Sequence, residues 1–153
     1  MATGFLRIKG NMYYFNQNGI MQTGFQTLNN KTFYFKENGC MLTGFQKING
    51  NTYYFTKRGV MAKGFKKLNG QTYYFHDNGT MAVGVQKVGS SNYYFKANGT
   101  MATGFQKING KTYYYKENGT MAYGMQTIGK DRYYFKSDGT LLTGRVKIGN
   151  CLY

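Results

Sequence analysis

Aromatic and basic side chains recur together along this sequence, and they are the residues whose chemistry could bind a ligand. Phe45, Lys47 and Tyr54 form one such set, and the same residue types return at positions 105, 107 and 114. Aromatic faces stack on flat or apolar groups and attract cations, whereas lysine ammonium groups attract anions. The pattern therefore favours ligand binding.

Residues that could catalyse a reaction are few and scattered. The acidic residues form no recurring pair that could act as a general acid and a general base, and they are Glu37, Asp77, Glu117, Asp131 and Asp138. His76 is the single histidine, and Cys40 and Cys151 are too few for a zinc site. We therefore expect no enzyme activity, no cofactor and no metal site.

The charge of the chain is strongly one-sided. Lys and Arg number 20 against 5 Asp and Glu, which gives a net charge of +15. This exceeds the net charge of about 2 to 8 units that suits the solubility of a small domain. Anionic polymers are the partners that such a field attracts, and they include phosphate-rich wall chains, acidic glycans and nucleic acid.

Glycine, an aromatic triplet and methionine all return every 20 residues without an insertion. One glycine series comprises Gly4, Gly24, Gly44, Gly64, Gly84, Gly104, Gly124 and Gly144. Such repetition is typical of solenoids, in which each unit contacts its neighbours. We expect residues 1–153 to be a single repeat array and, because the sequence begins and ends within a repeat, a piece of a longer one. No apolar run could span a membrane, and no signal peptide opens the sequence.

Each repeat is predicted to fold as a β-hairpin. Asn49-Gly50 lies between two short apolar runs, and Asn-Gly is the strongest short signal for a type I′ turn. A two-residue turn at this point would pair residues 44–48 with residues 51–55 and place Phe45 opposite Tyr54. The sequence therefore predicts an all-β protein.

The two faces of the predicted hairpin differ in character, because alternate side chains of a strand share a face. One face is expected to form the core, and it carries Ile48, Tyr53 and Phe55. The other is a half-exposed aromatic strip with a lysine beside it, and it carries Phe45, Lys47, Thr52 and Tyr54. Two interpretations of this strip stay open: its rings could join one hairpin to the next, or they could form a platform for a ligand.

Residues 104–124, GFQKINGKTYYYKENGTMAYG, resemble the cell-wall-binding repeat superfamily, which includes choline-binding modules, glucan-binding repeats and the C-terminal repeats of large clostridial toxins. The resemblance covers the whole chain, and it is strongest to the short repeats of the toxins. It implies a left-handed β-solenoid of about seven 20-residue hairpins, with roughly three hairpins per turn. It also implies an extracellular protein, either secreted or associated with the cell wall.

The resemblance also implies binding sites in the groove between hairpins. The candidate groove residues are Phe25, Tyr34, Phe45, Tyr54, Met61, Phe65, Tyr74, Phe105, Tyr114 and Met121. The basic residues expected to face a polyanion are Lys47, Lys67, Lys87 and Lys107.

The resemblance to choline-binding modules, taken residue by residue, disfavours choline as the ligand. The unit matched to a choline cage holds Phe45, Thr52, Tyr54 and Met61, so that one aromatic wall is missing and phenylalanine replaces the first tryptophan. A quaternary ammonium group prefers tryptophan and is repelled by a neighbouring positive charge, here Lys47. The expected partner is a glycan or another cell-wall polymer, such as teichoic acid or a polysaccharide.

The sequence thus predicts a non-catalytic module that binds carbohydrate or bacterial cell-wall polymer. If the chain is the receptor-binding part of a toxin, the ligand would be a glycan of the host surface. Two alternatives stay open: a basic array that binds polyanions, with nucleic acid the weaker candidate, and a structural spacer.

Overall fold

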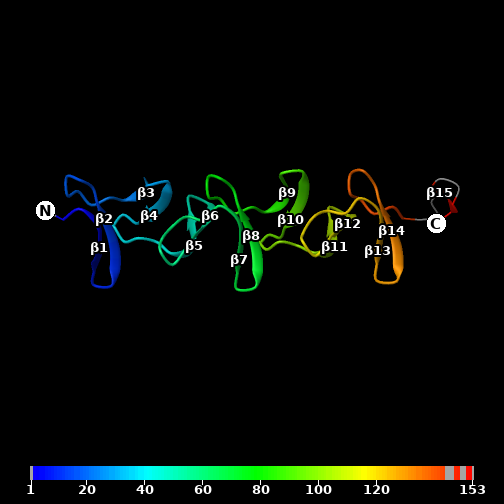
Figure 1. Cartoon of the computed structure of the whole chain (residues 1–153), viewed down its shortest axis with the longest axis horizontal. Coiled ribbons are helices and arrows are strands. Elements are labelled where there is room, and N and C mark those ends of the chain that lie inside the picture. Colours follow the sequence, from blue (N-terminus) through cyan, green and yellow to red (C-terminus); the bar gives the residue numbers. More distant parts are fainter. Residues whose placement is uncertain (1, 144–146, 149–150, 153) are drawn as a thin grey trace. The chain divides into compact units, whose positions relative to one another are not determined.

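The computed structural model describes residues 2–143, 147–148 and 151–152, and these form β-hairpins joined by turns (Figure 1). Each hairpin is a separate two-stranded sheet. The pairs are β1 (Gly4–Ile8) with β2 (Asn11–Phe15), β3 (Gly24–Leu28) with β4 (Lys31–Phe35), β5 (Gly44–Ile48) with β6 (Asn51–Phe55), β7 (Gly64–Leu68) with β8 (Gln71–Phe75), β9 (Gly84–Val88) with β10 (Ser91–Phe95), β11 (Gly104–Ile108) with β12 (Lys111–Tyr115), β13 (Gly124–Ile128) with β14 (Asp131–Phe135), and β15 (Lys147–Ile148) with β16 (Cys151–Leu152).

The turns have the conformation that the sequence predicts. Asn49 and Gly50 have φ angles of 49° and 82°, so both central residues lie in the left-handed region that a type I′ turn requires. This turn fixes the register of β5 and β6, in which Phe45 lies opposite Tyr54 and Lys47 lies opposite Thr52. The predicted pairing is confirmed.

The chain forms two compact units, Met1–Leu68 with Tyr73–Met81 and Asn69–Thr72 with Ala82–Tyr153. In each unit, backbone hydrogen bonds join connecting segments to the hairpin one repeat before the one that they directly follow. The Met61 N–H donates to the Thr32 carbonyl at 2.7 Å in the first unit, and the Met121 N–H donates to the Asn92 carbonyl at 2.8 Å in the second. These bonds stack the hairpins into the expected β-solenoid.

The direction of the hairpins in the first unit fits a solenoid with about three hairpins per turn. Figure 1 shows β1 with β2 and β7 extending toward the same side, whereas β3 with β4 extends the other way. Among the described residues, no helix is long and apolar enough to cross a membrane.

From the second hairpin on, the third residue of the aromatic triplet forms the core. The largest side chains with no exposed surface are Phe35, Phe55, Phe75, Phe95, Tyr115 and Phe135. Ile48, Tyr53 and Phe55 are all buried, as predicted for this face, whereas Phe45 on the other face is 43% exposed. The alternation of side chains along a strand therefore separates core residues from surface residues.

Candidate functional site

Each exposed phenylalanine of the aromatic strip packs against a tyrosine of its own hairpin. Cross-strand partners share a face of a hairpin, which brings their rings into contact. The ring centroids are 4.8 Å apart for Phe25 with Tyr34, 4.9 Å for Phe45 with Tyr54, 4.9 Å for Phe65 with Tyr74 and 5.0 Å for Phe105 with Tyr114. The structure thus places eight of the predicted groove residues in four ring pairs.

A third ring reaches these sites from the following hairpin. The centroid of Phe45 lies 5.1 Å from that of Tyr73, and the contact recurs between Phe5 and Phe33, Phe25 and Tyr53, and Phe105 and Tyr133. Sequence reasoning assigned Tyr53 to the core alone and missed this second role. The sequence does carry this pattern: in the hairpin that follows each phenylalanine of the strip, the first residue of the triplet is aromatic.

The methionine of each site lies in the connecting segment that comes after the second hairpin of that site. Phe5, Phe33 and Met41 line one pocket together. By the same relationship, Met61 packs with Tyr53 in a buried cluster. Each site therefore combines residues of two hairpins and of the connecting segment after the second.

The sequence groups Phe45 with Met61, whereas the structure packs Met61 with Tyr53 and Tyr34. The methionine hydrogen-bonded to the hairpin of Phe45 is Met81, whose N–H donates to the Thr52 carbonyl at 2.8 Å. The Met121 N–H likewise donates to the Asn92 carbonyl, and for the hairpin of Phe105 the corresponding residue is Leu141, whose N–H donates to the Thr112 carbonyl. Sulfur is thus absent at the site of Phe105, where the sequence predicted it.

The strip is neither closed core nor open surface. Its phenylalanines are half-exposed, and they are Phe5, Phe25, Phe45, Phe65 and Phe105. Valine and methionine replace the ring at Val85 and Met125, which are also exposed. Part of each phenylalanine ring is thus accessible while the rest joins adjacent hairpins.

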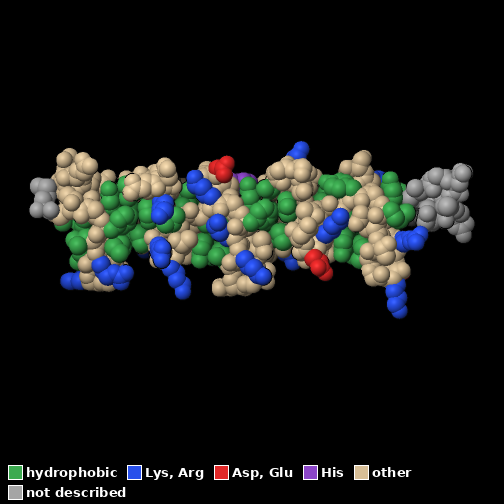
Figure 2. Space-filling model, viewed as in Figure 1, with side chains coloured by type: hydrophobic (Ala, Val, Ile, Leu, Met, Phe, Trp, Pro, Cys, Tyr) green, Lys and Arg blue, Asp and Glu red, His purple; other side chains and the backbone are tan. Residues whose placement is uncertain are grey.

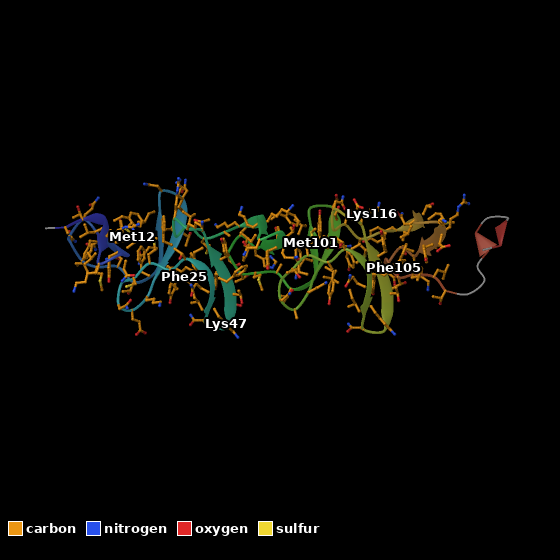
Figure 3. The ribbon with its side chains drawn as sticks, turned by 90° about the horizontal axis from the view of Figure 1, so that it is seen from below. Met12, Phe25, Lys47, Met101, Phe105 and Lys116 are labelled. Carbon is orange, nitrogen blue, oxygen red and sulfur yellow. The ribbon has the colours of Figure 1, made fainter. Side chains whose placement is uncertain are left out.

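The basic residues of the strip lie farther along the hairpins. The predicted polyanion-facing residues Lys47, Lys67, Lys87 and Lys107 are all exposed. Figure 3 shows Lys47 near the end of its hairpin, and Phe25 nearer to the base of its own. Figure 2 shows Lys and Arg side chains on both units and few acidic side chains on the same face. The role of these lysines in binding stays a prediction.

No cluster of three or more His, Cys, Asp and Glu side chains suited to a metal ion occurs among the described residues. Cys40 is a free thiol whose Sγ donates a hydrogen bond to the Tyr13 hydroxyl at 3.2 Å. This bond is the main cause that raises the pKa of Tyr13. The side chain of Cys151 lies outside the described residues.

The geometry does not support the expectation against choline. Thr52 leaves no aromatic wall missing, because Tyr73 of the next hairpin supplies a third ring next to Phe45 and Tyr54. Three rings therefore surround one half-exposed site, and ring faces attract quaternary ammonium groups.

Comparison with known proteins identifies the repeats. A family model described as choline-binding repeat matches residues 2–41, 42–83, 63–103 and 102–126, and one described as putative cell wall binding repeat matches residues 126–141. The search of curated proteins gave no match. The closer likeness to clostridial toxin repeats is tested by none of these results and stays a prediction.

Solved structures agree with the family match. A structure of choline binding protein F from Streptococcus pneumoniae shares 33% identity with this chain, with a TM-score of 0.93 over 97% of this chain and 54% of that protein. A second structure of that protein, determined in the presence of a peptidoglycan analogue, shares 34% identity with a TM-score of 0.90 over 92% of this chain and 52% of the other. A structure of CbpF in complex with ipratropium shares 30% identity with a TM-score of 0.85 over 93% and 49%.

This chain therefore spans about half the length of these relatives. The family model covers most of the chain, and the aromatic sites recur in register with its repeats. On this evidence, the chain belongs to the choline-binding repeat family.

Proposed function

We propose that this chain is a non-catalytic module that binds the quaternary ammonium groups of a choline-bearing cell-wall polymer. The observation that carries the proposal is the meeting of three rings, Phe45, Tyr54 and Tyr73, at a half-exposed site between two hairpins. A quaternary ammonium group has no hydrogen to donate, so that ring faces are well suited to recognise it. The complex of CbpF with ipratropium, a quaternary ammonium compound, supports the assignment.

Each proposed site combines residues of two successive hairpins and of the connecting segment after them. They are formed by Phe25, Tyr34, Tyr53 and Met61, by Phe45, Tyr54, Tyr73 and Met81, and by Phe105, Tyr114, Tyr133 and Leu141. Phe65 with Tyr74 contributes one further ring pair. Cation–π contact at a half-exposed site is worth about 0.5–2 kcal/mol, so that each site alone is weak.

A polymer that carries many choline groups would occupy several sites at once. Linked sites raise the effective concentration of the ligand and increase avidity without a strong single contact. The backbone of a wall polymer such as teichoic acid is anionic, and the net charge of +15 would attract it over a longer range. The proposed location is accordingly extracellular, at a bacterial surface.

The test is a titration with choline chloride, followed by the methyl NMR signals of the methionines. We expect the signals of Met61 and Met81 to shift and to saturate with the same midpoint as protein retention on a choline-substituted resin. Sodium chloride at equal ionic strength is the control. The proposal would be contradicted if choline did not shift the methionine signals of the folded protein and the protein bound a wall polysaccharide without choline groups. That result would favour carbohydrate recognition.

A further inference from the structure

One aromatic site differs from the others in its surroundings. Phe5, Phe33 and Met41 line a pocket of about 590 Å³ in the first unit, and we call it the N-terminal pocket. Phe5 and Phe33 have their ring centroids 5.1 Å apart, as at the other sites. The aromatic part of the site is therefore retained, and the difference lies at its rim.

The rim of the N-terminal pocket is basic. Its charged side chains are Arg7, Lys31, Lys57 and Arg58, and the described residues that line the pocket include no Asp or Glu. All four cationic side chains are exposed. Four positive charges around one pocket oppose the entry of a quaternary ammonium group and favour an anion.

The neighbouring site lacks this rim. At the site of Phe25, Tyr53 and Met61, the positions that correspond to the four basic residues hold Thr27, Asn51, Asp77 and Asn78. The two sites thus share their aromatic residues and differ in charge.

Arg58 also replaces a residue that stabilises the turn. Its position holds Asn or Asp in the other hairpin loops, namely at Asn18, Asn38, Asn78, Asn98, Asn118 and Asp138. In five of these loops the side-chain oxygen accepts a hydrogen bond from the backbone N–H two residues later, as Asn78 does from Thr80 at 3.0 Å. An arginine has no acceptor, so that this bond cannot form in the loop of Arg58.

A substitute bond keeps the loop of Arg58 folded. Thr56 Oγ1 accepts a hydrogen bond from the Val60 N–H at 3.1 Å. The loop thus retains its shape while an arginine stands where the other repeats use an amide or a carboxylate. A local feature that departs from its repeats, with a compensating contact, is expected where a ligand is bound.

We propose that the N-terminal pocket binds a phosphate group of a polyol phosphate polymer, with the polyol carbons against Phe5, Phe33 and Met41. Guanidinium groups suit this role because their planar donors match two phosphate oxygens at once. The volume of the pocket is that of a small-molecule site, which holds one phosphate and its adjoining polyol better than a nucleobase stack. The inference goes beyond the proposed function, because the ligand is an anion and its binding does not depend on choline binding elsewhere.

The experiment uses the methyl signals of Met41 and Met61 to report on the two sites separately. Glycerol phosphate is the probe, and we expect it to shift the methyl signal of Met41 and not that of Met61. Arg58→Asn should weaken this binding about fivefold, because it removes one charge-assisted contact. The variant should fold, because other repeats have asparagine at this position. Lys116→Asn is the matched control, since it removes the same charge from an exposed loop position outside the pocket.

Three results would overturn the inference. Glycerol phosphate could leave the Met41 signal unchanged. Alternatively, Arg58→Asn and Lys116→Asn could weaken binding equally, which would indicate attraction by net charge alone. A thymidine oligonucleotide that shifts Met41 at a lower concentration than glycerol phosphate would replace the wall polymer with nucleic acid as the ligand. A choline titration read at Met61 tests the proposed function independently of all three.

Discussion

The thioether of Met61 occupies the space next to Gly79 where any other residue would carry its β-carbon. A β-carbon built on Gly79 collides with Met61 Sδ and lies 2.7 Å from Met61 Cε. Gly79 also has a φ angle of 85°, which disfavours every residue with a side chain. The same contact recurs between Gly59 and Met41 and between Gly119 and Met101.

Gly79→Ala is accordingly expected to destabilise the protein by about 2–5 kcal/mol, from backbone strain of about 1–2 kcal/mol and overpacking of about 1–3 kcal/mol. Gly50→Ala is the matched control, because Gly50 has a φ angle of 82° and nothing within 4 Å of its added β-carbon. It should show only the backbone strain. Urea denaturation would measure both variants, and equal losses would rule out the role of Met61.

Tyr115→Phe should stabilise the protein. The Tyr115 hydroxyl is buried and has no hydrogen-bond partner among the described residues, whereas the corresponding core position of the other full hairpins holds phenylalanine. An unsatisfied buried hydroxyl costs about 1–3 kcal/mol, and its removal should recover part of this free energy. A urea midpoint below that of the unchanged protein would show that the hydroxyl has a partner.

The same tyrosine should make stability fall at alkaline pH. Burial is the main cause that raises the pKa of Tyr115 well above its usual value of 10.0. Above pH 10 the unfolded chain therefore loses the Tyr115 proton while the folded chain keeps it, so that the free energy of unfolding decreases with rising pH. The loss should be smaller in Tyr115→Phe, and parallel pH profiles for the two proteins would contradict the assignment.

Substitutions on both sides of one site should weaken choline binding to a similar extent. Phe45→Ala and Tyr73→Ala each remove one ring of the same site, and we expect each to lower affinity at Met81 about tenfold. Val85→Ala removes no ring and should leave that affinity unchanged. If Tyr73→Ala keeps full affinity in a folded protein, the ring of the second hairpin has no part in the site.

Val85→Phe should create a site. Val85 is exposed and lies opposite Tyr94, and the second unit already holds Tyr113 and Met121 at the positions that complete the other sites. A phenylalanine would supply the missing ring, so that choline should now shift the Met121 signal. Val85→Leu, which adds bulk without a ring, is the control, and equal responses of the two variants would contradict this prediction.

The hairpins could be predicted from the sequence because their determinants are local. The Asn49-Gly50 turn fixes the register, and alternation along the strand separates Phe55 in the core from Phe45 on the surface. The 20-residue period also predicts a solenoid, whereas the number of hairpins per turn is implied only by the resemblance to a repeat family.

The composition of each site could not be predicted in the same way. The contact of Phe45 with Tyr73 depends on the rotation from one hairpin to the next, which the pattern within a hairpin does not encode. For this reason the sequence groups Met61 with Phe45, whereas the structure packs it with Tyr53. The ring of Tyr73 at the site of Phe45 is likewise not evident from one repeat alone. The expectation against choline followed in part from overlooking this ring.

The contact of each phenylalanine with a ring of the next hairpin has a consequence for how such arrays change. A hairpin is the segment that duplication or deletion would copy, but a binding site exists only at the junction of two hairpins. Moving one hairpin to a new position would therefore alter the sites on both of its sides, even though no residue within it had changed. The order of the repeats, as well as their sequences, determines which ligands the array can hold.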